Sequence, residues 1–162
     1  MNLIHTEPLT ATAFAPFGQV LAADGPPDRL INRGLCGRWH DRAELDFGPG
    51  GRAGISVFLA QPRALPYDCD LLERHPEGSQ AFLPLHSHPF LVIVAPDAGG
   101  IPGAPRAFVT SGAQGINLNR GTWHGVLTPL AAPGLFAVVD WIGHTPNLQE
   151  YGLPEPFRVV AA

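Results

Sequence analysis

The residues best suited to chemistry interrupt one apolar stretch, LLERHPEGSQAFLPL. Glu73 and His75 are two residues apart, so on a strand both side chains point to the same face. Pro76 and Gly78 indicate a tight turn, after which Gln80 begins a returning strand opposite the pair. We therefore expect three polar side chains to converge from one hairpin.

A fourth candidate follows in NRGTWHGVL, where Gly121 precedes His124 by three residues at the start of another strand. The two stretches resemble the two-part signature of cupins, which is His-x-His, four residues and Glu, and later Pro-x-Gly-x-x-His. Here Glu73 stands for the first His, Gln80 for the Glu and Asn119 for the Pro. The resemblance implies a cupin scaffold with an altered metal-ligand set.

Two chemistries are open to this set. Two imidazoles, one carboxylate and a weaker amide ligand can hold a divalent ion such as Ni, Mn or Zn through Glu73, His75, Gln80 and His124. The histidines can also act as acid–base groups without metal. A lone histidine is more often structural, but the matched spacing of both favours function. No organic cofactor is expected.

The only literal His-x-His in the chain is formed by His86 and His88. Ser87 and Pro89 indicate a turn at this position, and no acidic residue follows at the cupin spacing. We interpret both histidines as loop residues.

The elements that must position these residues are short, because Gly and Pro together make up 37 of 162 residues. Apolar stretches rich in Val, Ile, Phe and Leu predict strands at residues 55–60, 67–75, 80–85, 90–95, 106–110 and 135–142. Many short strands separated by turns predict an all-β fold, here a cupin-type β-barrel (double-stranded β-helix or jelly roll).

Helical signals are few. Thr10 is a potential cap for a short helix over residues 11–17, and a second turn is expected over residues 41–47. Residues 96–105 are predicted to form a surface loop. The tail at residues 153–162 is expected to form an edge segment or to contact a partner subunit. The length predicts a single domain over residues 1–162.

Composition excludes several classes of protein. The net charge of −4 and a charged fraction of 15% argue against nucleic-acid binding. All ten basic residues are Arg, so neither a Schiff-base lysine nor a P-loop can exist. Cys36 and Cys69 match no disulfide or metal motif and predict free thiols. The first residues do not resemble a signal peptide, and no apolar run is long enough to span a membrane. We expect a soluble, cytoplasmic protein.

Residues 72–82, LERHPEGSQAF, resemble the signature of the ureidoglycolate lyase family. Further matches are Ile31-Asn32, Gly34-Leu35, RWHD at 38–41, Ala60-Gln61-Pro62, Arg106-Ala107-Phe108, Gln114-Gly115, Asn117, Arg120, Trp123-His124 and Asp140. The resemblance covers most of the chain. It implies a homodimeric cupin enzyme, a carbon–nitrogen lyase of the amidine-lyase type. Its reaction would split (S)-ureidoglycolate into urea and glyoxylate in allantoin degradation.

The resemblance also implies roles. Glu73, His75 and His124 are the expected catalytic residues, with a histidine as base and Glu73 orienting it or serving as acid. The expected substrate-binding residues are Gln80, Arg38, His40, Asp41, Asn117, Arg120, Trp123 and Asp140. Among them, Arg38 and Arg120 suit the substrate carboxylate.

The chain departs from the family pattern at Leu59, Leu118, Asn119, Gly125 and Trp141. These departures affect the expected identity of the substrate more than they affect the expected fold. Alternative hypotheses are another metal-dependent cupin enzyme acting on a small carboxylate, a non-catalytic cupin that binds a small molecule, and a folded but inactive family member.

Overall fold

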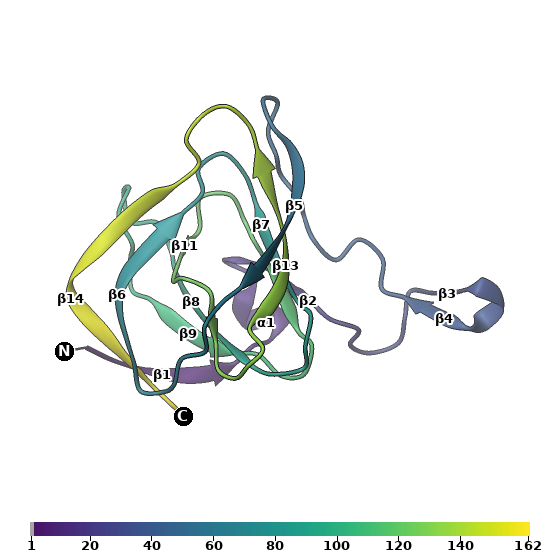
Figure 1. Cartoon of the computed structure of the whole chain (residues 1–162), viewed down its shortest axis with the longest axis horizontal. Coiled ribbons are helices and arrows are strands. Elements are labelled where there is room, and N and C mark those ends of the chain that lie inside the picture. The colour runs from purple at the N-terminus through teal and green to yellow at the C-terminus, as the bar shows by residue number, and fades with distance from the viewer. Residues whose placement is uncertain (1) are drawn as a thin grey trace.

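The computed structural model describes residues 2–162, and its regular structure is almost entirely strands, several of which close into a barrel (Figure 1). Six strands form the ring through hydrogen bonds between neighbours. In order around the ring they are β11 (Trp123–His124), β6 (Tyr67–Arg74), β14 (Gln149–Val160), β1 (Asn2–Pro8), β9 (Arg106–Val109) and β8 (Phe90–Ala95), which pairs again with β11. A short strand, β12 (Thr128–Pro129), pairs with the start of β8.

A second sheet packs against the ring. Its order is β2 (Gly18–Leu21), β10 (Gly115–Leu118), β7 (Gln80–Pro84), β13 (Leu135–Ile142) and β5 (Arg52–Leu59). The helix α1 (Ala11–Phe14) begins at Thr10, whose hydroxyl accepts a hydrogen bond from the amide of Ala13 at 3.2 Å. The side chain of Thr10 thus satisfies one of the amides that a helix start leaves unpaired.

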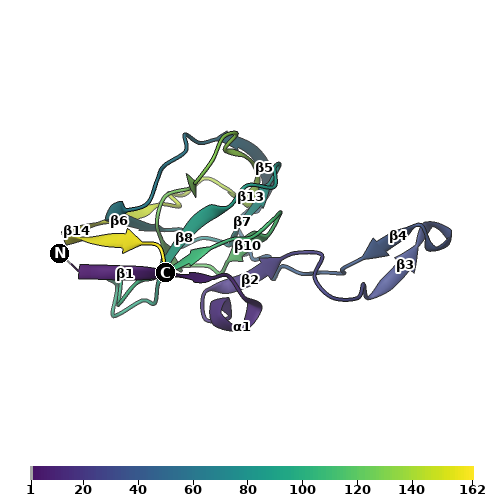
Figure 2. The same cartoon turned by 90° about the horizontal axis from the view of Figure 1, so that it is seen from below.

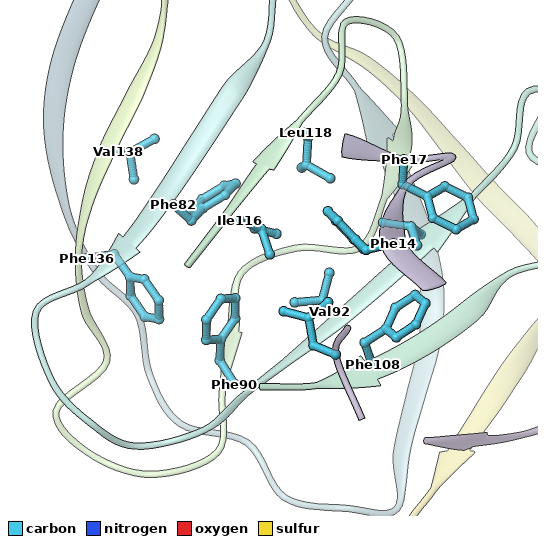
Figure 3. Close-up of a cluster of buried hydrophobic side chains, with 12 residues drawn as sticks. Phe14, Phe17, Phe82, Phe90, Val92, Phe108, Ile116, Leu118, Phe136 and Val138 are labelled. Atoms are coloured by element: carbon cyan, nitrogen blue, oxygen red, sulfur yellow. The ribbon is translucent and has the colours of Figure 1, made fainter. Parts of the chain in front are cut away.

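Strand β8 separates two hydrophobic cores, and all six of its residues are buried. Phe90, Val92 and Val94 point to the core between the sheets, which also holds Phe136 and Phe108 (Figure 3). The alternate residues of β8 point into the ring, where they pack with residues such as Leu72 and Trp123. A continuous apolar run is what a strand covered on both faces requires.

A long hairpin extends away from the barrel, as Figures 1 and 2 show. It contains β3 (Arg29–Ile31), a 3-10 turn, η1 (Asn32–Gly34), and β4 (Cys36–Arg38). We call residues 24–42 the arm. No residue from 23 to 50 is buried, so the arm contributes nothing to either core.

The predicted all-β barrel with one or two short helices is confirmed. The six predicted strands correspond to β5, β6, β7, β8, β9 and β13, and residues 96–105 form the expected loop around a single bridge between Asp97 and Pro102. Both cysteines are free, as expected. Within residues 2–162, no helix is long and apolar enough to cross a membrane.

Three predictions about elements are wrong. β6 and β7 do not pair as a hairpin, because β6 lies between β11 and β14 while β7 lies between β10 and β13. The tail is no edge segment, because β14 pairs with both β1 and β6. Residues 41–47 contain no helix, and α1 ends at Phe14, earlier than predicted.

Candidate functional site

Glu73 and His124 lie opposite each other on the neighbouring strands β6 and β11. His75 follows the end of β6, and its ring centroid is 5.2 Å from that of His124, with the planes tilted by 34°. One ligand atom from each of Glu73, His75 and His124 lies within 4.8 Å of the others. We call these three residues the triad. The structure thus brings together three of the four residues that the spacing singled out.

A turn between β10 and β11 holds the two histidines at this distance. Gly121 has a φ of +74°, which a glycine adopts at little cost. Its amide donates to the carbonyl oxygen of His75 at 3.0 Å, and the amide of Thr122 closes the turn on Asn119 at 3.1 Å. This is the structural role of Gly121 in the Asn-x-Gly-x-x-His motif.

Both imidazoles have one nitrogen fixed by a backbone carbonyl. Nδ1 of His75 lies 2.7 Å from the carbonyl oxygen of Asn147, and Nδ1 of His124 lies 2.9 Å from that of Gly125. Because a carbonyl oxygen only accepts, each Nδ1 carries the proton and each Nε2 keeps a lone pair. Both Nε2 atoms are buried, and neither has a hydrogen-bond partner within residues 2–162. Two lone pairs beside a carboxylate can serve as a metal site or as bases.

Burial shifts the pKa values of His124 and Glu73 in opposite directions. Burial and, to a smaller extent, the nearby charge of His75 together lower the pKa of His124 to about 4, against the hydrogen bond to Gly125, which raises it. Burial also raises the pKa of Glu73, an effect that His75 opposes and Glu150 reinforces. Since His124 is neutral near pH 7, its 4.0 Å approach to Glu73 is a polar contact and not an ion pair.

Gln80 and Asp140 form a second polar pair on the other sheet. They lie opposite each other on β7 and β13, and Nε2 of Gln80 donates to Oδ2 of Asp140 at 3.4 Å. Alternation places both on the face that carries the buried Phe82 and Val138. Oε1 of Gln80 is buried and has no hydrogen-bond partner within the described part of the chain. Gln80 therefore offers a free acceptor inside the fold.

Arg120 and Trp123 flank His124 in sequence but contact acidic residues outside the triad. Arg120 makes two hydrogen bonds to the carboxylate of Asp46, at 2.7 and 2.9 Å. The indole of Trp123 donates to Asp97 at 2.9 Å, and the guanidinium of Arg74 lies 4.5 Å from the ring centroid. These contacts hold the side chains around β11 in place.

Asn117 is fully buried on β10 and ties a loop to the barrel. Its amide nitrogen donates to the side-chain oxygen of Gln19 at 2.8 Å and to the carbonyl oxygen of Glu44 at 3.2 Å. The amide of Glu44 also donates to Gln19 at 3.0 Å. This small network anchors the segment that follows the arm.

Three predicted substrate-binding residues, Arg38, His40 and Asp41, lie on the arm. The amide of His40 donates to Asp28 at 2.8 Å, a contact within the arm itself. The structure does not bring these three residues to the triad of their own chain.

Sequence reasoning missed Asn147 and Glu150. Asn147 holds His75 through its carbonyl, and its side-chain oxygen accepts from the amide of Glu77 at 2.8 Å. Glu150 lies opposite Glu73 on β14. A backbone carbonyl in a loop leaves no pattern in a sequence, and the pairing of β14 with β6 joins distant segments. His86 and His88 stack at 5.7 Å in the bend between β7 and β8, as the loop prediction required.

The family model described as ureidoglycolate lyase matches residues 1–160 of this chain. The chain is 62% identical over 159 residues to the ureidoglycolate lyase of Rhodobacter capsulatus, covering 98% of this chain and 99% of the relative. It is 49% identical over 160 residues to that of Chelativorans, covering 98% and 97%. A third relative, ureidoglycolate lyase 2 of Rhizobium meliloti, is 45% identical over 153 residues, covering 94% of each chain.

Proposed function

Because the chain belongs to the ureidoglycolate lyase family, we propose that it cleaves (S)-ureidoglycolate into urea and glyoxylate. The observation that carries the proposal is the triad, with two free Nε2 atoms and a partly buried carboxylate in one small space. The activity is that of a carbon–nitrogen lyase of the amidine-lyase type, within the degradation of allantoin.

The substrate carbon bears a hydroxyl, a carboxylate and the ureido nitrogen. Its cleavage requires a base for the hydroxyl proton and an acid for the departing nitrogen. We assign the base to Nε2 of His75 or His124 and the acid to Glu73, whose raised pKa favours the protonated form. The C–N electron pair leaves with nitrogen, which takes the proton of Glu73. The former hydroxyl becomes the carbonyl of glyoxylate, and the imidazolium returns its proton to Glu73.

A divalent metal fits the same residues. Glu73, His75 and His124 would hold it, with Gln80 as the proposed fourth ligand, since the histidine nitrogens are already oriented by backbone carbonyls. Ni, Mn and Zn are the candidate ions. When bound, the ion would act as a Lewis acid toward substrate oxygen.

We propose that Gln80 and Asp140 bind polar groups of the substrate from the second sheet. Asn117, Arg120 and Trp123 are proposed to act by shaping this region, because their polar atoms contact other residues of the chain. We further propose that residues 1–162 work as one domain, in the cytoplasm, as a homodimer that binds neither nucleic acid nor membranes.

The test is the release of urea and glyoxylate from ureidoglycolate, with and without added divalent metals. His124→Ala is expected to abolish turnover, because it removes one free Nε2 and one side of the triad. His88→Ala is the matched control, a histidine in the bend before β8, and should keep wild-type turnover. Circular dichroism verifies that both variants fold. Near-normal turnover by His124→Ala would reject the assignment.

A further inference from the structure

The triad and the polar pair of Gln80 and Asp140 lie on faces that are turned toward each other. His124 lies directly opposite Val94 on β8, and Val94 belongs to the core between the sheets. Since directly opposite residues share a face, His124 also points toward the second sheet. Gln80 precedes Phe82 by two residues on β7, and Phe82 belongs to the same core. The two polar sets therefore face one space from opposite sheets.

A cavity borders this space. Its lining includes His124 of the ring, Leu118 and Phe82 of the second sheet, and Val92 of β8 (Figure 3). Leu118 lies directly opposite Gln80 in the pairing of β10 with β7, so the two side chains share a face. Gln80 thus lies next to the cavity wall that faces His124.

Asp140 determines which end of the Gln80 amide is left free. Nε2 of Gln80 donates to Oδ2 of Asp140 at 3.4 Å, and Oε1 is buried without a hydrogen-bond partner within residues 2–162. The reverse orientation would bring Oε1 against a carboxylate oxygen, and two acceptors form no hydrogen bond. Within the same residues, no cationic side chain forms an ion pair with Asp140. The pair therefore presents an acceptor backed by a negative charge.

The substrate of the proposed reaction has one group that suits this acceptor. Its carboxylate only accepts hydrogen bonds and is repelled by the charge of Asp140. Its hydroxyl has a single proton, which the base of the triad removes. The ureido group has three N–H bonds, one on the nitrogen that leaves and two on the terminal amino group. The terminal amino group is therefore the donor that remains for Oε1 of Gln80.

We infer that Gln80, held by Asp140, binds the terminal amino group of the substrate and makes the site selective for ureides over amides. The inference rests on the proposed function. Of the two roles proposed for Gln80, metal ligand and substrate ligand, it favours the second, because Gln80 lies on the sheet opposite the triad. Asp140 acts through Gln80 as a positioning residue, since it holds the amide nitrogen and leaves the oxygen free.

Selectivity is measured with N-acetyl-α-hydroxyglycine as the second substrate. This compound keeps the carboxylate, the hydroxyl and the reacting N–H, but a methyl group replaces the terminal amino group. Cleavage releases glyoxylate from either compound, together with urea or acetamide. The ratio of the two kcat/KM values is the selectivity for the ureide. Because the compounds differ in intrinsic reactivity, this ratio is compared between protein variants.

Gln80→Leu removes the acceptor and nearly keeps the size of the side chain. It should lower kcat/KM for ureidoglycolate roughly 10- to 100-fold, the loss expected when a buried hydrogen bond to substrate is not made. The kcat/KM for the acetyl compound should be unchanged, so the selectivity falls by the same factor. Gln114→Leu is the matched control, because Gln114 bonds with Ser111 and Leu9 away from the cavity, and it should keep wild-type selectivity.

Asp140→Asn tests the positioning role. An amide at position 140 offers a donor as well as an acceptor, so it no longer keeps Oε1 of Gln80 turned away from it. Selectivity should therefore fall although Gln80 is intact. A purely structural role would lower kcat/KM for both compounds equally and leave the ratio unchanged, and that result would overturn the role of Asp140.

A nickel titration without substrate tests the competing role of Gln80. Isothermal titration calorimetry with Ni²⁺ alone should give the same affinity for the wild type and for Gln80→Leu. A weaker affinity of the variant, or wild-type selectivity in Gln80→Leu, would overturn the inference. Failure of the proposed function is distinguishable, because the wild-type protein would then release neither urea nor glyoxylate from ureidoglycolate, and the inference would fail with it.

Discussion

The buried position of His124 makes its imidazole a much weaker base than a free histidine, because burial lowers its pKa. It is only 4% exposed, and an apolar cavity lined by Phe82, Ile93 and Leu118 borders it. Among residues 2–162, no carboxylate lies in hydrogen-bonding contact with its ring, because Nδ1 contacts the carbonyl of Gly125 and Nε2 has no partner. Such a nitrogen stays unprotonated and free to bind metal or accept a proton from substrate across the physiological range.

This predicts a pH dependence of stability for the metal-free protein. The folded pKa of His124 is about 4, whereas that of the unfolded chain is near 6.5. The contribution of His124 to the free energy of unfolding is therefore fully present above pH 6.5 and is lost as the pH falls toward 4. The loss is on the order of 3 kcal/mol for this group. Glu73 acts in the opposite direction, because its folded pKa is raised and its protonated form is favoured.

Comparing the wild type with a His124 variant isolates the contribution of His124 to the pH dependence of stability. Urea unfolding in EDTA, at several pH values, should give a steeper loss of stability for the wild type than for His124→Gln, which lacks the titrating ring. Parallel curves for the two proteins between pH 6.5 and 4 would contradict the lowered pKa.

At the scale of elements, sequence reasoning located strands but not their partners. Periodicity and turn residues identify a strand such as β8 from its own residues. The partners of β6 depend on β14, whose residues are more than seventy positions away. The predicted hairpin of β6 and β7 was wrong for this reason, although Glu73 and His75 did reach His124. The resemblance to the cupin signature grouped Glu73, His75 and His124 in one ligand set without predicting which strands pair, and the pairing of β6 with β11 brings Glu73 opposite His124.

A substitution at Gly121 tests whether the turn between β10 and β11 positions the triad. A Cβ at Gly121 meets no atom within 4 Å, so Gly121→Ala causes no clash, only the cost of a positive φ, about 1 kcal/mol. Gly99 is the matched control, with a φ of +73° and open space in the loop after β8. Both Ala variants should lose similar stability in thermal unfolding. Only Gly121→Ala should lower kcat, because its amide holds the carbonyl of His75. Equal kcat values would show that this turn does not position the triad.

At the scale of the whole molecule, residues 2–162 form two cores that share the neighbouring strands β8 and β9. The site depends on the two halves together, since the triad belongs to the ring while Gln80 and Asp140 belong to the second sheet. The arm is the part that the sequence could not place. Its residues, including the exposed Leu30 and Leu35, contribute to neither core of their own chain.

Because every residue of β8 is buried in one core or the other, we predict one cooperative unfolding transition. Phe90 and Leu91 are neighbours on β8 that point into different cores, and both are almost fully buried. We expect Phe90→Ala to cost about 3–5 kcal/mol and Leu91→Ala about 2–5 kcal/mol, the usual range for such cavities. Each should lower the midpoint of the same single transition, because neither core keeps its packing once β8 leaves. Far-ultraviolet circular dichroism and tryptophan fluorescence, recorded during denaturant unfolding, should therefore coincide in both variants. If Leu91→Ala instead separated the two signals, the ring would unfold independently of the second sheet, and the triad would be lost in a molecule that kept Gln80 and Asp140.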